Sequence, residues 1–574
     1  MYTIGTARRG KPIGLTNIER ARHIHVIGSV GTGKSKLLEY LIRQDIAAGR
    51  GLCLLDPHGT LADKIEQWCA FRGLGKLRTI HVIRPGDDSH VPGFNPLRSV
   101  PGEALSVRVD GMVAACAQAW NVRDLSETPR LEKVIRALFF ALSARNLTLA
   151  EGPALLRAAD PEGVRRMLTE GLPDPMFQMV WDELNGLSRR DFAEQVESTM
   201  NRLARFLASP AIRLVVGQRE RAIDFRRAMD HGEVVIVNLG ATTKFTYENA
   251  RLLGTLIIND LFLTALGRDE ATARRRPFSL YIDEAYDFLS GDIERVLDQT
   301  RKFGLHAVLA HQRLGHLKAR GEGIYNAVMS ITNKIVLGGL SDADAEVMTR
   351  EIMRDDIDLE RPKRTITMPV VTDEVPFWLE AESSSEGYSD NYAVSRSENI
   401  SSQSGTSASL SETFGATGFA IGNRQSIASG TTTSEGTTTT QTTSTTEGFS
   451  RSWSKSQGRS QTLRSIREER PTTYYSLEES FHFALKKLRN LPDRAAIVKR
   501  RGERTVRVNT VEVKPLLTMP ETLRRFREKS AATSPCVSTI ADATAEIAER
   551  QRSMLGVSPD GVVEADFWHE EDPA

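Results

Sequence analysis

The sequence predicts an α/β protein whose mainly parallel central sheet is interrupted by an all-helical insertion. Three observations support this prediction: strand-like apolar runs alternate with helical stretches, a long block between two groups of runs has helical spacing, and a glycine-rich loop follows the first run. Strands that alternate with helices favour a parallel sheet covered on both faces. The runs lie at residues 23–27, 52–55, 79–83, 233–239, 278–282, 306–310 and 334–337.

The helical insertion is indicated by a change of period. From about Glu103 to Phe225 the apolar residues recur at helical spacing, as in Leu131, Ile135 and Leu138. We therefore expect one sheet domain in two parts around an inserted all-α domain. The expected boundaries are residues 1–100 and 229–382 for the sheet domain and 101–228 for the insertion.

Residues 383–465 differ from the rest of the chain because serine and threonine approach half of the segment and apolar residues are sparse. This composition favours disorder, since little apolar surface is available to bury. Ser450, Ser452, Ser454 and Ser456, however, alternate with other residues, and a period of two suits an extended hairpin. Both interpretations of this low-complexity arm stay open.

The chain then resumes a folded pattern. A short helix is expected at 477–488, and a hairpin at 495–499 and 505–508. We expect a small basic α+β module over residues 466–515, followed by a polar C-terminal tail over residues 516–574.

Composition excludes several classes of protein. The 574 residues include 75 lysine or arginine and 74 aspartate or glutamate residues, and 40% are hydrophobic, which excludes a wholly disordered, collagen-like or strongly polybasic chain. The longest apolar stretch, Leu252 to Gly267, contains Asn259 and Asp260, so direct membrane insertion is not expected. Four widely spaced cysteines and no visible secretory signal indicate a reducing cytoplasm.

The most specific motif is a phosphate-binding loop, the Walker A pattern G-x-x-x-x-G-K-[ST], between an apolar run and an amphipathic helix. Its backbone N–H groups and the helix start would hold nucleotide phosphates, Lys34 would reach the β- and γ-phosphates, and Ser35 would ligate Mg²⁺. A chance glycine-rich turn is the alternative. The motif predicts ATP and Mg²⁺ as cofactors, bound through Gly28, Ser29, Val30, Gly31, Thr32, Gly33, Lys34 and Ser35.

Two acidic residues follow the run at 278–282. A phosphate-binding loop requires a carboxylate on a neighbouring strand to hold the metal, the Walker B acid, and Asp283 supplies it. Glu284 comes next and would polarise the attacking water, which indicates hydrolysis. The alternative is that both acids cap a helix that starts near Ala285.

Polar residues end two further strands. Gln312 follows the run at 306–310 and would sense the γ-phosphate or orient water, whereas its neighbour His311 is expected to be structural. Asp56 either lies beside the phosphate loop or begins the turn before the next helix, and the sequence leaves both roles open.

Together these motifs resemble the RecA-like motor ATPases of the FtsK and HerA type. Within that group the chain is most similar to the coupling proteins that feed DNA to type IV secretion and conjugation machines. The resemblance spans roughly residues 4–340 and implies a RecA-like P-loop NTPase domain whose inserted all-α domain matches that of coupling proteins in position. It rests on residues 28–35, 56–59, 93–97, 281–285 and 301–312.

The resemblance also implies an assembly. In this family an arginine shortly before the strand that follows the acidic pair reaches the neighbouring subunit's nucleotide site, and Arg301 occupies that place. Arg313 is a rival, and a solvated cation is the alternative for Arg301. The resemblance further implies a homohexamer, DNA as the polymer that is moved, and secretion or mobilisation proteins as partners that would recruit it to the inner membrane.

The leading hypothesis is therefore a hexameric ATP-hydrolysing DNA translocase for conjugative or mobile-element transfer. Nine lysine and arginine residues between Lys486 and Arg507, against Asp493 and Glu503, form a local basic patch that would contact phosphates or simply face solvent. Two alternatives stay open, a secretion ATPase that handles protein and a nucleotide-gated assembly platform.

Overall fold

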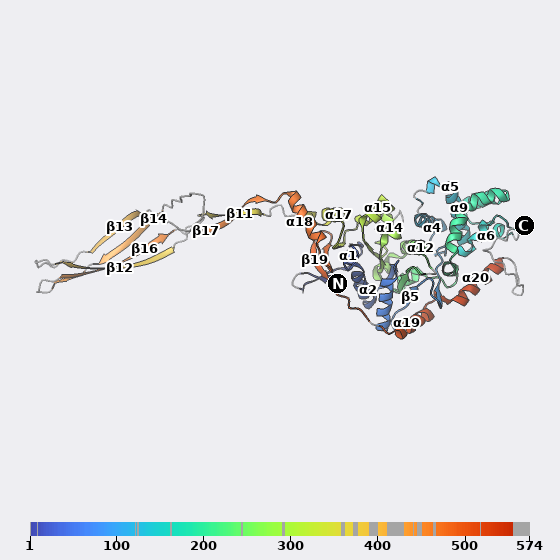
Figure 1. The fold of residues 1–574 in the computed structure, drawn as a ribbon, viewed down its shortest axis with the longest axis horizontal. Coiled ribbons are helices and arrows are strands. Elements are labelled where there is room, and N and C mark those ends of the chain that lie inside the picture. Colours follow the sequence, from blue (N-terminus) through green and yellow to red (C-terminus); the bar gives the residue numbers. More distant parts are fainter. Residues whose placement is uncertain are drawn as a thin grey trace. The chain divides into compact units, whose positions relative to one another are not determined.

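The structure is a computed structural model that divides into two compact units, Met1–Ile357 with Glu478–Ala574, and Asp358–Leu477 (Figure 1). The structure describes residues 2–554 apart from 8–9, 101, 121, 123–124, 161–162, 243–244, 290–292, 357–361, 371–376, 390–399, 410–429, 440, 445–449, 463–465 and 517.

A sheet of eleven described strands forms the centre of the first unit, in the order β2-β1-β19-β18-β10-β3-β9-β8-β4-β7-β5. From β10 to β5 all neighbouring strands are parallel, and β18, β19, β1 and β2 extend one edge with antiparallel pairs. The predicted α/β class with a mainly parallel sheet is confirmed. The strands are β1 (Tyr2–Thr6), β2 (Pro12–Leu15), β3 (Ile24–Ile27), β4 (Gly51–Asp56), β5 (Ile80–Ile83), β7 (Val234–Asn238), β8 (Phe278–Ile282), β9 (Leu305–His311), β10 (Lys334–Leu337), β18 (Ala495–Lys499) and β19 (Val506–Thr510).

Both faces of this sheet are buried because side chains alternate across each strand. In β4, Leu52 and Leu54 pack in one apolar cluster, whereas Cys53 and Leu55 pack in the other. The first cluster is covered by α2 (Lys34–Ala47) and α3 (Thr60–Phe71). The opposite face is covered by α12 (Tyr247–Leu266), α14 (Ile293–Thr300), α15 (Leu314–Arg320), α16 (Glu322–Met329) and α17 (Asp342–Ile352), with short helices α1 (Asn17–Arg20) and α13 (Glu270–Arg275) elsewhere in the unit.

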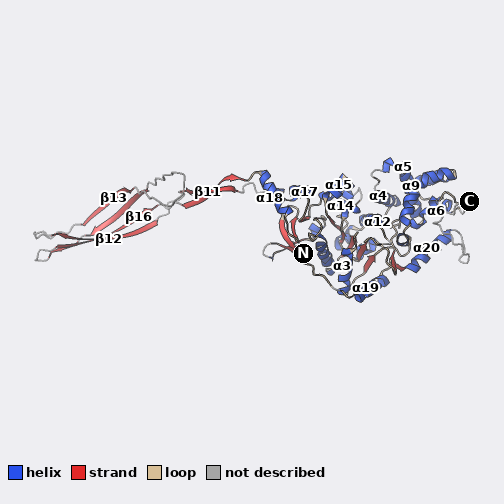
Figure 2. Cartoon of the chain, in the orientation of Figure 1, coloured by secondary structure: helices blue, strands red, loops and turns tan. Residues whose placement is uncertain are grey.

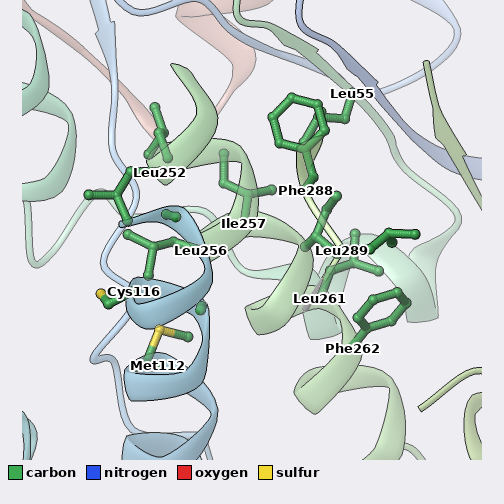
Figure 3. Packing of buried hydrophobic residues seen from close by; sticks show 14 of the residues in the cluster. Leu55, Met112, Cys116, Leu252, Leu256, Ile257, Leu261, Phe262, Phe288 and Leu289 are labelled. Carbon is green, nitrogen blue, oxygen red and sulfur yellow. The ribbon is translucent and has the colours of Figure 1, made fainter. Parts of the chain in front are cut away.

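Between β5 and β7 the described chain is helical apart from the short strand β6 (His90–Pro92). Its helix α4 (Leu105–Ala119) packs on α12, where Met112 and Cys116 lie close to Leu252 and Leu256 (Figure 3). Across the described residues, no helix has both the length and the apolar content needed to cross a bilayer. The other helices of this block are α5 (Pro129–Ala144), α6 (Gly152–Leu156), α7 (Val164–Thr169), α8 (Pro175–Asn185), α9 (Arg189–Leu207), α10 (Pro210–Val216) and α11 (Phe225–His231).

The chain after the second unit differs from expectation. The hairpin β18–β19 was expected in a separate module over residues 466–515, but it completes the central sheet between β10 and β1, because its apolar residues bury against that sheet. It follows α18 (Leu477–Arg489). The expected polar tail is also packed on the unit as far as residue 554, through α19 (Pro520–Thr533), β20 (Val537–Thr539), which pairs with β6, and α20 (Ile540–Met554).

The second unit consists of antiparallel strands in its described part (Figure 2). Strand β12 pairs with β16 along its whole length, and β13 pairs with β14. The sequence left two alternatives for residues 383–465, an extended hairpin and disorder. In the described part of this segment the strands pair, as the serine period favours. The strands are β11 (Pro362–Val370), β12 (Phe377–Ser389), β13 (Ile400–Ser409), β14 (Gly430–Thr439), β15 (Gln441–Ser444), β16 (Ser450–Thr462) and β17 (Ile466–Tyr474).

Candidate functional site

The phosphate-binding loop joins β3 to α2 at the carboxyl edge of the parallel strands. Gly31 and Gly33 have positive φ angles of 84° and 101°, which glycine adopts without steric cost. A side chain at Gly28 would meet the Cβ of Leu337 at 2.8 Å, so only glycine fits there. Gly33 caps α2 without a side-chain hydrogen bond, which leaves the first N–H groups of the helix for a ligand.

The remaining loop residues have distinct environments. The Ser29 hydroxyl donates to the carbonyl of Gly339, and the Thr32 hydroxyl donates to the carbonyl of Ser29 at 2.8 Å. Val30 is 80% exposed at the tip of the loop, and Ser35 is half-buried in the first turn of α2. The two hydroxyl contacts brace the loop, so its backbone is fixed without a ligand.

Three of the predicted catalytic residues meet beside this loop. The Lys34 ammonium lies 2.6 Å from Oε1 of Glu284 and 3.7 Å from Oδ1 of Asp283. The side-chain amide of Gln312 donates to the same Glu284 oxygen at 2.5 Å. These residues and Asp283 follow the carboxyl ends of three neighbouring strands. Lys34 follows β3, Gln312 follows β9, and the two acids follow β8.

Glu284 is held in an uncommon backbone conformation. Its φ of 48° and ψ of 52° lie in the left-handed region, which costs a residue with a side chain about 1–2 kcal/mol. Its Oε2 atom is buried and has no hydrogen-bond partner among the described residues. A buried carboxylate oxygen without a partner can accept a hydrogen bond from a bound water, which suits a residue that polarises a nucleophile.

Asp283 has a perturbed protonation equilibrium. Burial raises the pKa of Asp283 to about 6, and the neighbouring carboxylates of Glu284 and Asp56 add to this rise while Lys34 opposes it. A cation beside Asp283 would offset this cost. The oxygen donors of Asp283 and Ser35 are those that Mg²⁺ prefers, so the residues present fit a magnesium nucleotide.

Two further residues have structural roles in the described geometry. The Asp56 carboxylate accepts from the backbone N–H groups of His58, Leu61 and Ala62, at 3.0, 2.7 and 2.9 Å, and so fixes the turn that starts α3. His311 stacks on His25 with ring centroids 4.8 Å apart, and burial lowers the pKa of His311 to about 3. His311 is therefore a neutral core residue next to Gln312.

The two candidate arginines lie at opposite ends of strand β9. Arg301 is exposed in the turn before β9, and Arg313 is exposed just after β9. Because β9 has seven residues, about 20 Å separates its ends. The structure therefore brings Arg313 to the edge that holds Lys34 and Glu284, and it does not bring Arg301 there.

Sequence reasoning did not place Arg494 at this site. Its backbone N–H donates to the carbonyl of Thr32 at 3.3 Å, and a side chain built on Gly33 would lie 3.7 Å from its Cγ. Arg494 has a φ of 65°, and its carbonyl accepts from the backbone N–H of Thr510 at 2.8 Å. In the sequence it is one of nine cations in a basic patch, and only the position of β18 beside β10 brings it to the loop.

No family model matches the chain, and no curated protein matches it. Among solved structures, the chain is similar to the bacterial conjugative coupling protein TrwBdeltaN70 in an unbound form, with a TM-score of 0.50 and 14% identity over 91% of this chain and 90% of that one. The chain has the fold of this coupling protein. The fold expected from the resemblance is thus confirmed.

Two further structures are less similar. The plasmid coupling protein TrwB in complex with the ATP analogue ADPNP has a TM-score of 0.49 at 14% identity, over 91% of this chain and 92% of that one. VirB4 of Thermoanaerobacter pseudethanolicus has a TM-score of 0.41 at 17% identity, over 61% of this chain and 87% of that one.

Proposed function

We propose that this chain is a Mg²⁺-dependent ATPase that moves DNA as a homohexamer during conjugative or mobile-element transfer. The observation that carries the proposal is the meeting of Lys34, Glu284 and Gln312 beside an uncapped helix start. A cation, a carboxylate with a free buried oxygen and an amide at one phosphate-binding loop are the groups that hydrolysis of a γ-phosphate needs.

Each residue has a distinct role in this proposal. The loop N–H groups and Lys34 bind the phosphates, and Lys34 exchanges its contact with Glu284 for one with the γ-phosphate. Asp283 and Ser35 would hold Mg²⁺, which would neutralise charge on the phosphates. Once Lys34 has moved, Glu284 orients the attacking water through its carboxylate, and Gln312 fixes the position of that carboxylate.

The hexamer and the DNA cargo rest on the positions of basic residues and on the fold. Arg301 is exposed at the sheet edge opposite its own phosphate loop, a position from which it can serve only a neighbouring subunit. The exposed loop of hairpin β18–β19 carries Arg501 and Arg504, which would contact DNA phosphates. Secretion or mobilisation proteins would be the partners of such an assembly.

The decisive experiment is steady-state ATP hydrolysis with and without long double-stranded and single-stranded DNA, across a salt series. We expect DNA to raise turnover several-fold and added salt to abolish the rise, because phosphate contacts release counterions. Lys34→Ala should lose ATP binding, and Glu284→Gln should bind ATP but lose about 100-fold or more in turnover. Turnover that ignores DNA would contradict the DNA motor and favour a protein cargo or an assembly platform.

A further inference from the structure

A second cavity lies away from the phosphate loop, between the inserted helices and α12. Its volume is about 330 Å³, within the range of small-molecule sites. The end of α4, one face of α9 and the first turns of α12 form its walls. Its lining includes Trp120, Arg202, Arg205, Glu248 and Arg251.

Three arginines line this cavity against one carboxylate, Glu248. The described contacts of Arg202 are with the backbone carbonyl and hydroxyl of Ser198, and Arg251 donates to the carbonyl of Ala119. Within the described part of the chain, Arg202, Arg205 and Arg251 make no ion pair with a carboxylate. The cavity therefore has more positive than negative side chains, and an anion in it would reduce the repulsion between the arginines.

Two arginines of the same helical block show how a carboxylate compensates a guanidinium group. Arg108 contacts Asp260 at 2.6 Å, and Arg136 contacts Glu132 at 3.0 Å. Arg251, by contrast, has a buried Nε atom with no partner among the described residues. A buried donor without an acceptor is costly, so the Arg251 guanidinium lacks part of the compensation that Arg108 has.

The cavity also has an aromatic wall. Trp120 is half-buried at the end of α4, and the guanidinium carbon of Arg202 lies 5.9 Å from the centroid of its ring. A flat ring next to several guanidinium groups suits a ligand that has a planar base and a negative group, since bases stack on aromatic side chains and phosphates take forked contacts from arginine.

We propose that this cavity binds a nucleoside phosphate, with the phosphate on Arg202, Arg205 and Arg251 and the base against Trp120. Two kinds of ligand carry a nucleoside phosphate, a free nucleotide and a nucleotide within a nucleic-acid strand. The lining shares no residue with the phosphate loop at residues 28–35, so this proposal does not rest on the proposed ATPase activity.

The test measures binding to the full chain carrying Lys34→Ala, which weakens the phosphate loop as a competing site. The probes are a nucleoside monophosphate and a labelled single-stranded oligonucleotide. Arg202→Ala with Arg205→Ala should weaken binding of at least one probe about tenfold or more, because it removes two charge-assisted contacts to the phosphate. Loss in the monophosphate arm identifies a free nucleotide, and loss confined to the oligonucleotide arm identifies a strand.

Two further variants complete this test. Arg190→Ala removes another exposed arginine of α9 that does not line the cavity, and it should leave affinity unchanged. Arg205→Glu alone changes an exposed position, so its loss of binding cannot come from misfolding. Unchanged affinity in both cavity variants overturns the proposal. So does an acidic peptide that binds more tightly than either probe and depends on the same arginines.

Discussion

Asp283 and Glu284 end the same strand but differ in environment. Glu284 is paired with Lys34 and Gln312, whereas Asp283 accepts the backbone N–H of Glu284 and meets Lys34 only at 3.7 Å. Burial therefore dominates the protonation of Asp283, and its partners dominate the geometry of Glu284. Adjacent carboxylates can thus have different tasks, one for the metal and one for the water.

The raised pKa of Asp283 predicts a pH dependence. Between its ordinary value of 3.8 and about 6, the folded protein holds a proton that the unfolded chain has lost. The free energy of unfolding of the nucleotide-free protein should therefore fall as pH rises through this window. Hydrolysis at subsaturating Mg²⁺ should show the opposite trend and weaken as pH drops through this window, because the metal must displace the proton of Asp283.

Thermal unfolding and turnover measured across this pH range would check both trends. Asp283→Asn cannot titrate, so it should remove this part of the pH dependence of stability. A wild-type unfolding temperature that does not change relative to Asp283→Asn across the window would contradict the raised pKa.

Arg494 predicts two effects of opposite sign. Arg494→Gly should relieve the left-handed backbone and raise the free energy of unfolding by up to about 1 kcal/mol. The Arg494 guanidinium pairs with Glu512 at 3.3 Å while its Cγ lies beside Gly33, and if the guanidinium turns to a bound phosphate, the variant should also weaken ATP binding several-fold. Arg494→Ala should weaken ATP binding by the same factor as Arg494→Gly, but it should not raise the free energy of unfolding. Denaturant unfolding and equilibrium ATP binding measure the two effects.

A matched control for Arg494 is Arg504→Ala, an exposed cation of the same hairpin. It should leave ATP affinity unchanged. Equal ATP affinity in wild type and Arg494→Ala would show that the guanidinium does not contact the nucleotide.

At the scale of elements, the C-terminal helices stabilise the inserted block. Arg550 of α20 is buried and donates to Glu151 at 2.9 Å and to the carbonyl of Gly217. The Glu151 carboxylate also accepts from the backbone N–H of Thr148 at 2.8 Å. Arg550 therefore compensates the buried charge of Glu151, which lies 399 residues earlier in the chain.

Arg550→Met should lower the free energy of unfolding by about 3 kcal/mol, because it leaves the Glu151 carboxylate buried without a cation. Adding Glu151→Gln should recover part of the loss, since the amide carries no charge. Urea denaturation of the wild type and both variants gives the values. A loss that is no smaller in the double variant would indicate that packing, and not charge, holds α20.

At the scale of the whole molecule, Arg301 and the phosphate loop lie at opposite ends of the parallel strands. Parallel strands force this separation, because the start of β9 and the end of β8 lie at different edges. If Arg301 acts on a γ-phosphate, the site is complete only where two chains meet.

Mixing two inactive variants tests this arrangement. Arg301→Ala keeps its phosphate loop, and Lys34→Ala keeps its arginine, so mixed assemblies should contain complete sites. We expect each variant alone to lose about 1,000-fold in turnover, and the mixture to recover a substantial fraction. Full turnover by Arg301→Ala alone, or no recovery on mixing, would contradict a shared site.

The sequence by itself determined the local features of this protein. The phosphate loop, the acids after β8 and the helical period of the insertion each depend on residues that are close in the chain, so their spacing carries the information. The apolar runs also predicted all seven parallel strands of the described sheet. They did not predict β1 and β2, because short edge strands such as Tyr2–Thr6 have little pattern to read.

Only the tertiary structure decided which distant segments meet. It placed β18–β19 in the central sheet, brought Arg494 to the phosphate loop, and packed α20 on the inserted block. The same holds for the cavity, whose arginines come from α9 and α12 and share no motif. The physical reason is that apolar burial drives these contacts without direction, so the partner of each surface follows from the shape of the whole fold.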